Sequence, residues 1–119
     1  MPNHVSKKVA FVSGPYRAKT PYGIKQNIRN AEAVALELWK MGYAVICPHK
    51  NTSLFDGECP DLIWLDGALE LLRRSDIVVL IPGWAGSSGT REEIKESVKR
   101  GIPVFKWPEQ SQELQNLNK

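Results

Sequence analysis

Short, continuously apolar runs recur along the chain and predict its strands. The runs at 9–13 and 77–81 are each closed by a glycine and a proline, which is typical of strands that are buried on both faces and end in a tight turn. Shorter runs at 43–47 and 104–106 predict two further strands, the first of which is stopped by a proline. The chain is therefore expected to contain at least four short, buried strands.

Between these runs, apolar residues recur with helical spacing. The stripe over 24–38 predicts a helix of about four turns that ends near Gly42. Leucines spaced over 62–72 predict a second helix, and 90–100 reads as a third after a flexible glycine and serine turn. Residues 48–60 lack any periodicity, and a loop of this length in a compact domain is more often the wall or lid of a site than a simple connection.

Strands that alternate with helices predict an α/β fold. We expect a doubly wound, flavodoxin-like or Rossmann-like parallel sheet of four to five strands with helices on both faces. Residues 1–107 are assigned to this single domain, and the polar tail 108–119 is either disordered or a loosely docked helix. Ligands bind such sheets beyond the carboxyl ends of the strands, which here brings 13–20, 48–60 and 82–93 to one edge.

Composition excludes several classes of protein. The 119 residues are 42% hydrophobic and 24% charged, which is ordinary for a soluble domain, and the net charge of +3 is spread along the chain. A nucleic-acid polymer is therefore not an expected partner. No apolar stretch approaches the ~20 residues of a membrane helix, so we expect no membrane contact and a cytoplasmic location. Cys47 and Cys59 are expected to be free thiols, and without a cluster of metal-ligand spacing we expect neither metal nor cofactor.

The residues after the first strand predict an anion site. A Walker-type phosphate loop would need a second glycine before Lys19, and Pro15 removes an amide donor from the loop. The glycine pattern of dinucleotide sites and the acidic residues of a phosphoreceiver domain are also missing. Arg17 remains as a donor to an anionic ligand, with Ser13 and Gly14 before it.

The start of the third predicted helix carries the most informative polar residues. Ser87, Ser88 and Gly89 supply hydroxyls and unpaired amides at a helix N-terminus, which can cradle a phosphate. Thr90 and Glu93 have the spacing of a capping box, in which the glutamate bonds back to the cap amide. On this pattern alone, we favour the capping interpretation of Glu93 over a catalytic one.

Three motifs together resemble the nucleoside 2-deoxyribosyltransferase-like superfamily over residues 9–106. They are Phe-Val-Ser-Gly-Pro at 11–15, Leu-Ile-Pro-Gly-Trp at 80–84, and a Ser-x-Gly-x-x-x-Glu spacing over 87–93. The resemblance implies that Glu93 is a nucleophile that attacks the anomeric carbon of a nucleoside. The covalent glycosyl ester would then be resolved by water or by a second base, with retention at the anomeric carbon.

The same resemblance points to a nucleotide as the substrate. Deoxyribosyltransferases carry an Asp at the position of Ser87 to hold a free 5′-hydroxyl, and that charge would repel a phosphate. Relatives that hydrolyse 2′-deoxynucleoside 5′-monophosphates are more similar here, with Ser, Gly and Arg at the positions of Ser87, Gly89 and Arg17. We therefore expect a nucleoside 5′-monophosphate rather than a free nucleoside. The expected substrate-binding residues are Ser13, Gly14, Pro15, Arg17, His49, Ser87, Ser88 and Gly89.

Two positions depart from the family pattern. Phe11 stands where many members have Tyr, and Ala68 stands where an Asp handles the proton on the departing base. Proton donation would then fall to His49, Asp56 or Glu58, or turnover would be weak or absent. Loss of a general acid typically costs about 10²- to 10⁴-fold in rate.

Three functions stay open on the sequence alone. The first is an N-glycosidase or deoxyribosyltransferase acting on nucleotides, and the second is a nucleotide-binding module of the same fold without turnover. The third, by analogy of fold, is cleavage of the nicotinamide glycosidic bond of NAD. Family members commonly close the pocket with a neighbouring subunit, so we expect a homodimer or a larger homo-oligomer. Trp64 and Trp84 each either stack on a nucleobase or cover the sheet edge.

Overall fold

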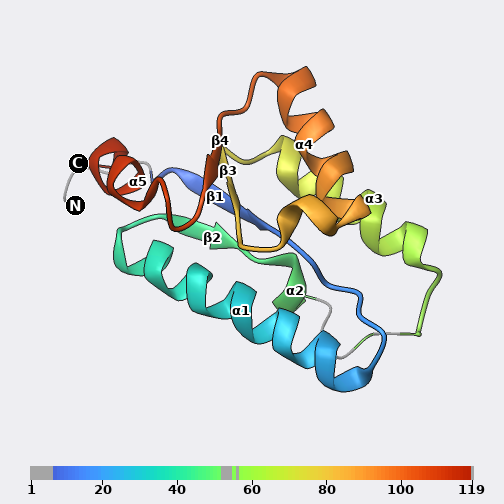
Figure 1. The fold of residues 1–119 in the computed structure, drawn as a ribbon. Coiled ribbons are helices and arrows are strands. Elements are labelled where there is room, and N and C mark those ends of the chain that lie inside the picture. Colours follow the sequence, from blue (N-terminus) through green and yellow to red (C-terminus); the bar gives the residue numbers. More distant parts are fainter. Residues whose placement is uncertain (1–6, 52–54, 56, 119) are drawn as a thin grey trace, which may run out of the picture.

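A sheet of four parallel strands forms the centre of the molecule. The computed structural model describes residues 7–51, 55 and 57–118. The strands lie in the order β2-β1-β3-β4, and each neighbouring pair is parallel (Figure 1). The expected α/β fold with a parallel sheet is confirmed. The strand bounds are β1 Val9–Ser13, β2 Ala44–Ile46, β3 Ile77–Leu80 and β4 Val104–Lys106.

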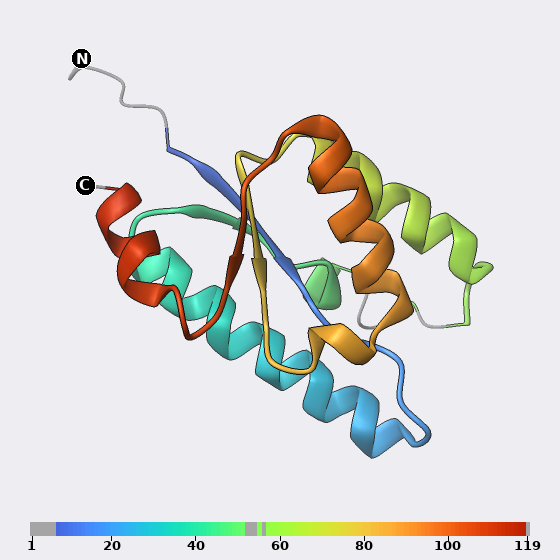
Figure 2. The ribbon, with the colours of Figure 1, turned by 45° about the horizontal axis from the view of Figure 1, so that its top comes forward.

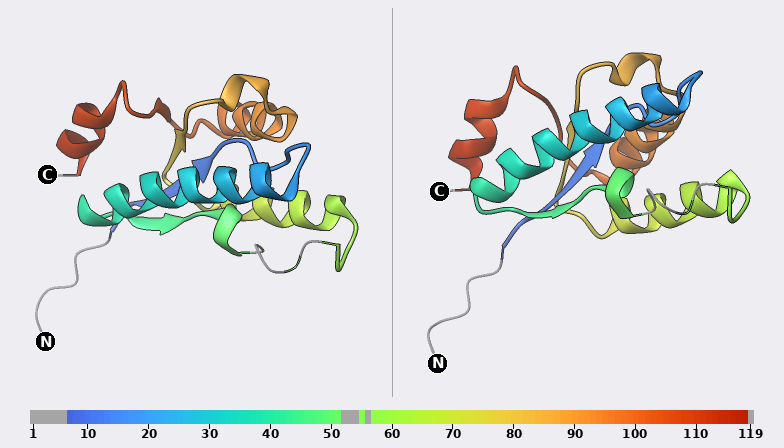
Figure 3. Two further views of the ribbon diagram at one scale, coloured as in Figure 1. Left: turned by 60° about the horizontal axis from the view of Figure 1, so that its bottom comes forward. Right: turned by 90° about the horizontal axis from the view of Figure 1, so that it is seen from below.

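Helices cover both faces of this sheet, as predicted (Figures 2 and 3). α1 and α5 pack on one face, and α3 and α4 pack on the other. The first four residues of the predicted loop 48–60 form a short helix, because the amides of Lys50 and Asn51 bond to the carbonyl of Cys47. The bounds are α1 Pro21–Lys40, α2 Pro48–Asn51, α3 Asp61–Arg73, η1 Trp84–Gly86, α4 Ser88–Arg100 and α5 Ser111–Leu117.

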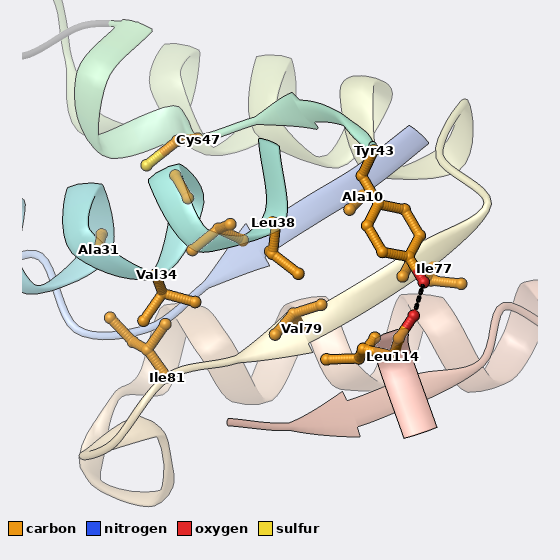
Figure 4. Close-up of a cluster of buried hydrophobic side chains, with 12 residues drawn as sticks. Ala10, Ala31, Val34, Leu38, Tyr43, Cys47, Ile77, Val79, Ile81 and Leu114 are labelled. Carbon is orange, nitrogen blue, oxygen red and sulfur yellow. Dashed lines mark hydrogen bonds between the residues drawn. The ribbon is translucent and has the colours of Figure 1, made fainter. Parts of the chain in front are cut away.

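Alternation along the strands divides the apolar side chains between two cores. Within β1, Ala10 and Val12 face α1, whereas Phe11 faces α3 and α4. The larger core lies on the α1 side and is shown in Figure 4. The helical stripe that the sequence predicted is buried there, and its members are Ala31, Val34, Ala35 and Leu38.

Helix α1 is longer than its apolar stripe predicted. It begins at Pro21 instead of Ile24 and runs for 20 residues. Thr20 caps it, because its Oγ1 accepts a hydrogen bond of 3.0 Å from the amide of Gly23. The first turn holds no buried residue, so apolar periodicity could not locate it.

Of the two alternatives for the polar tail, the structure shows a docked helix. Leu114 in α5 is fully buried in the larger core. The hydroxyl of Tyr43 donates a 2.5 Å hydrogen bond to the carbonyl of Leu114 (Figure 4), and Asn118 Nδ2 donates to the carbonyl of Met41. Residues 111–118 are therefore tied to the end of α1 and the start of β2.

Helix α3 buries less of its apolar stripe than its pattern suggested. Leu72 is fully buried, but Leu62 and Leu65 are 65% and 46% exposed. The strands are only three to five residues long, and the first turns of α3 extend beyond the sheet (Figure 1). Those turns have no sheet to pack on, and they stand beside the carboxyl ends of the strands instead.

Three further findings concern the described residues as a whole. Cys47 is buried and Cys59 is partly buried, and both are free, as predicted. Within the described ranges, no helix combines the length and the apolarity that crossing a membrane requires. In the same ranges, no three His, Cys, Asp or Glu side chains gather in a way that could hold a metal ion.

Candidate active site

A cleft of about 770 Å³ opens at the carboxyl ends of the strands. This volume lies within the roughly 300–1,000 Å³ of typical small-molecule sites. Its walls come from the loop after β1, from α2, from α3 between Asp61 and Leu71, and from the start of α4. The three segments that the sequence assigned to one edge do meet there. Of the predicted site residues, those that line the cleft are Gly14, Pro15, Arg17, His49, Ser87, Ser88, Gly89 and Glu93.

Glu93 is the carboxylate at the floor of this cleft. Its Oε1 accepts a hydrogen bond of 2.5 Å from the hydroxyl of Ser13, at the end of β1. Ser13 is 1% exposed and does not line the cleft itself, so it acts on the site through Glu93. The contact joins residues 80 positions apart and fixes the carboxylate toward the cleft.

Burial perturbs the titration of this carboxyl group. Loss of solvent raises the pKa of Glu93 to about 7, and the hydrogen bond from Ser13 opposes that rise. Glu93 therefore exchanges its proton near neutral pH, where an ordinary glutamate is fully ionised. A strongly shifted carboxyl in a cleft is characteristic of functional sites.

The capping-box interpretation of Glu93 is wrong. Ser87 is the N-cap of α4, and its Oγ accepts a 3.2 Å hydrogen bond from the amide of Thr90. The helix begins at Ser88, two residues earlier than predicted, so Glu93 lies beyond the first turn. Its side chain bonds to Ser13 on the sheet instead of returning to its own helix terminus.

The N-terminus of α4 presents amides to the cleft. The first amides of a helix have no intrahelical acceptor. Ser87 Oγ takes the amide of Thr90, whereas the amides of Ser88 and Gly89 at the cleft wall have no acceptor among the described residues and can serve a ligand. The Thr90 hydroxyl, also in this wall, is buried and has no hydrogen-bond partner among the described residues. This end of α4 carries the positive pole of the helix dipole and favours an anion.

His49 positions the loop after β1. Its Nε2 lies 2.9 Å from the carbonyl of Pro15, and because a carbonyl only accepts, this nitrogen carries the proton. Burial lowers the pKa of His49, so the ring is neutral near pH 7. A neutral ring whose proton is held by a backbone carbonyl is poorly placed to protonate a departing base.

Gly14 brings the same loop close to the sheet. A Cβ on this residue would lie 2.1 Å from Cγ1 of Ile81, the residue after β3, so a larger side chain fits only if Ile81 or the loop shifts. Gly14 therefore lets the loop after β1 pass directly against Ile81, at the end of β3. The glycine therefore has a packing role in shaping the cleft.

The mouth of the cleft is crossed by an ion pair that no sequence pattern predicted. Arg17 Nη2 contacts Asp61 Oδ1, and the guanidinium also lies 5.3 Å from the ring centroid of Tyr16. Asp61 is the first residue of α3, and an acidic residue there has the ordinary explanation of complementing the helix dipole. Glu58, one of the proposed proton donors, is not in the cleft wall, and Asp56 lies outside the described residues.

The wall formed by α3 is mainly apolar. Ala68 lies in this wall, so the chain presents a methyl group to the cleft at the position where the sequence resemblance led us to expect an Asp. Trp64 is in the same wall and stacks on Phe55 with ring centroids 6.2 Å apart. Trp84 is outside the cleft wall and packs against the smaller core, which agrees with the covering role that was one alternative for it.

A family model places the chain among known sequences. This family model, of a domain of unknown function named DUF1937, matches residues 8–109 of the chain. The chain belongs to the DUF1937 family. The matched range includes all four strands and Glu93. No curated protein matches the sequence.

The DUF1937 domain is also similar to a solved enzyme structure. That structure is of a 2-deoxyribosyltransferase from the psychrotolerant bacterium Bacillus psychrosaccharolyticus, described as a biocatalyst for the synthesis of antiviral and antitumoral nucleosides. The TM-score is 0.61 with 23% sequence identity, over 82% of this chain and 70% of that one. The likeness confirms, for the fold, the resemblance to nucleoside 2-deoxyribosyltransferases that the motifs indicated.

Proposed function

We propose that this DUF1937 domain cleaves the bond between base and sugar of a (deoxy)nucleoside 5′-monophosphate, as an N-glycosidase or a deoxyribosyltransferase. The observation that carries the proposal is the orientation of Glu93, which Ser13 holds toward the cleft beside the N-terminus of α4. The likeness to a 2-deoxyribosyltransferase supports the same class of reaction.

The proposed reaction begins with nucleophilic attack by Glu93. Ser13 holds Oε1, and Oε2 forms a bond to C1 of the sugar while the bond from C1 to the base nitrogen breaks. The bonding electron pair leaves with the base, and solvent water supplies the proton that the base takes up. Water or a second nucleobase then attacks C1 and loses a proton to solvent. The ester bond breaks, and Glu93 is regenerated as a carboxylate. Two displacements at C1 give retention of configuration.

The phosphate preference rests on the groups around the α4 terminus. The amides of Ser88 and Gly89 and the guanidinium of Arg17 line the cleft and suit a dianion. Ser87 stands where a carboxylate would repel that dianion. A base would then extend toward the apolar wall formed by α3.

Screening of nucleotides tests this function directly. The protein is incubated with each 2′-deoxynucleoside 5′-monophosphate and with the matching nucleoside, and liberated base is measured by chromatography. We expect release from at least one monophosphate and much less from its nucleoside. Release from nucleosides alone would contradict the proposed substrate class.

A binding module without turnover is the second candidate, and Ala68 is the observation that favours it. The position facing the base carries a methyl group where an acid is expected. We predict that Ala68→Asp raises the rate of base release about tenfold, because a carboxyl group at that position can protonate the departing base. Ala85→Asp is the matched control, since Ala85 is exposed and outside the cleft wall. If Ala68→Asp and Ala85→Asp both bind the nucleotide tightly and neither releases base, the binding module is favoured.

The pH dependence of the reaction follows from the ionisation of the nucleophile. Glu93 attacks only as a carboxylate, and its pKa is raised to about 7 by burial. We therefore predict that kcat/KM increases about tenfold between pH 6 and pH 8 and then levels off. A pH profile of initial rates measures this. A kcat/KM that is constant from pH 5 to pH 8 would contradict the role of Glu93.

We also expect a homodimer or a larger homo-oligomer in the cytoplasm. Exposed apolar side chains beside the mouth of the cleft support association of subunits there. These side chains are Phe55, Leu62, Ile63 and Leu65.

A further inference from the structure

At the mouth of the cleft, the guanidinium of Arg17 is paired with Asp61, and the same guanidinium is the proposed ligand of the substrate phosphate. Arg17 comes from the loop after β1 and Asp61 from the start of α3, so the pair connects two walls of the cleft. Both side chains are about half exposed, at 50% and 63%. An exposed pair of this kind is easily exchanged for another partner.

A phosphate dianion is a suitable replacement for the carboxylate. It offers a guanidinium three terminal oxygens, where a carboxylate has two, and it carries more negative charge. Asp61 also has an alternative arrangement once it is displaced. It lies in the first turn of α3, whose N-cap Pro60 makes no side-chain capping bond, so its charge can stabilise the helix N-terminus instead.

We propose that Asp61 is a specificity-determining residue that competes with the substrate phosphate for Arg17. Only a ligand with an anionic group can displace Asp61 and then bind the guanidinium of Arg17. A nucleoside without phosphate leaves the ion pair in place, whereas a monophosphate replaces it. The inference rests on the proposed function, because it takes Arg17 as a phosphate ligand.

Binding measurements on a chain that cannot turn over test this role. The experiment uses Glu93→Gln protein and calorimetry with 2′-deoxyadenosine 5′-monophosphate and with 2′-deoxyadenosine. Adding Asp61→Asn removes the competing charge while keeping the size of the side chain. We expect the Kd of the monophosphate to fall about two- to fivefold, the range for an exposed ion pair, and the Kd of the nucleoside to stay unchanged.

Two controls separate competition from general electrostatics. Asp66→Asn removes an exposed charge from the same helix at a position outside the cleft wall, and it should alter neither Kd. In an Arg17→Gln background, Asp61→Asn should no longer tighten binding of the monophosphate, because there is no guanidinium to release. This double-mutant cycle measures the coupling between the two residues.

The possible outcomes separate this inference from the proposed reaction. The competition is overturned if Asp61→Asn leaves the Kd of the monophosphate unchanged or raises it. It is equally overturned if the substitution lowers the Kd of the monophosphate and of the nucleoside by the same factor, or if it lowers the Kd of the monophosphate by the same factor with Arg17 and with Arg17→Gln. It is also overturned if the monophosphate does not bind at millimolar concentration. If the Asp61 effect is present but native protein releases no base from any nucleotide, the proposed reaction fails and the competition stands.

Discussion

Replacing Glu93 with Gln is expected to lower base release by at least about 10³-fold, because the amide cannot form the glycosyl ester. Gln has the same size and can still accept the hydrogen bond from Ser13 that holds the side chain in place. Binding of the nucleotide is therefore expected to persist. Chromatography of liberated base gives the rate, and calorimetry with a 2′-deoxynucleoside 5′-monophosphate gives the affinity.

Glu92→Gln is the matched control for this substitution. Glu92 precedes Glu93 on α4, is exposed, and pairs with Lys95 on the outer surface of the helix. The control removes the same charge from the same turn without changing the cleft, so its rate should equal that of native protein. Base release that persists in Glu93→Gln at the native rate would refute the assigned nucleophile.

The same substitution is expected to change how stability depends on pH. The pKa of Glu93 is raised from 4.5 to about 7 by burial, so ionisation of the folded protein is disfavoured. A raised pKa contributes stability that is fully present below pH 4.5 and is lost as the pH rises through about 7. The difference between these two values corresponds to about 3 kcal/mol. Glu93→Gln does not ionise and should keep that stability at high pH.

Urea unfolding at pH 4, pH 6 and pH 8.5 measures this effect in both chains. The difference in unfolding free energy, variant minus native, should rise with pH and approach about 3 kcal/mol. Other groups contribute equally to both chains, including Glu96, whose pKa is lowered by Arg73 and Arg100. A difference that is independent of pH would show that Glu93 is as well solvated as an ordinary surface carboxylate.

The expected effects of Glu93→Gln on rate and on stability both follow from the burial of one ionisable side chain. Burial of Glu93 in the cleft disfavours the ionised form that the proposed attack on C1 requires. Ser13 offsets part of this cost, since its hydrogen bond lowers the pKa of Glu93.

Local patterns predicted most of the fold. The runs at 9–13 and 77–81 are apolar at nearly every position because their strands are covered on both faces. The stripe in α1 follows the period of the helix because only one side of it meets the sheet. The order of these elements was enough to place three segments at one edge, where the cleft is found.

Elements whose positions depend on distant partners were not predictable in the same way. α5 is mostly polar, and its single buried residue, Leu114, gives no periodicity. The first turns of α3 carry apolar residues that a helical pattern assigns to a core, although the short strands end before reaching them. In both cases the surroundings of the element decide its burial.

The sequence by itself determined the parallel sheet, the order of its elements and the group of polar residues at the strand ends, because periodicity and turn residues act over a few positions. Only the tertiary structure decided that Glu93 meets Ser13 instead of capping α4, and that Asp61 pairs with Arg17. These contacts join residues 80 and 44 positions apart. Their geometry depends on how helices and strands pack against one another, which no local pattern records.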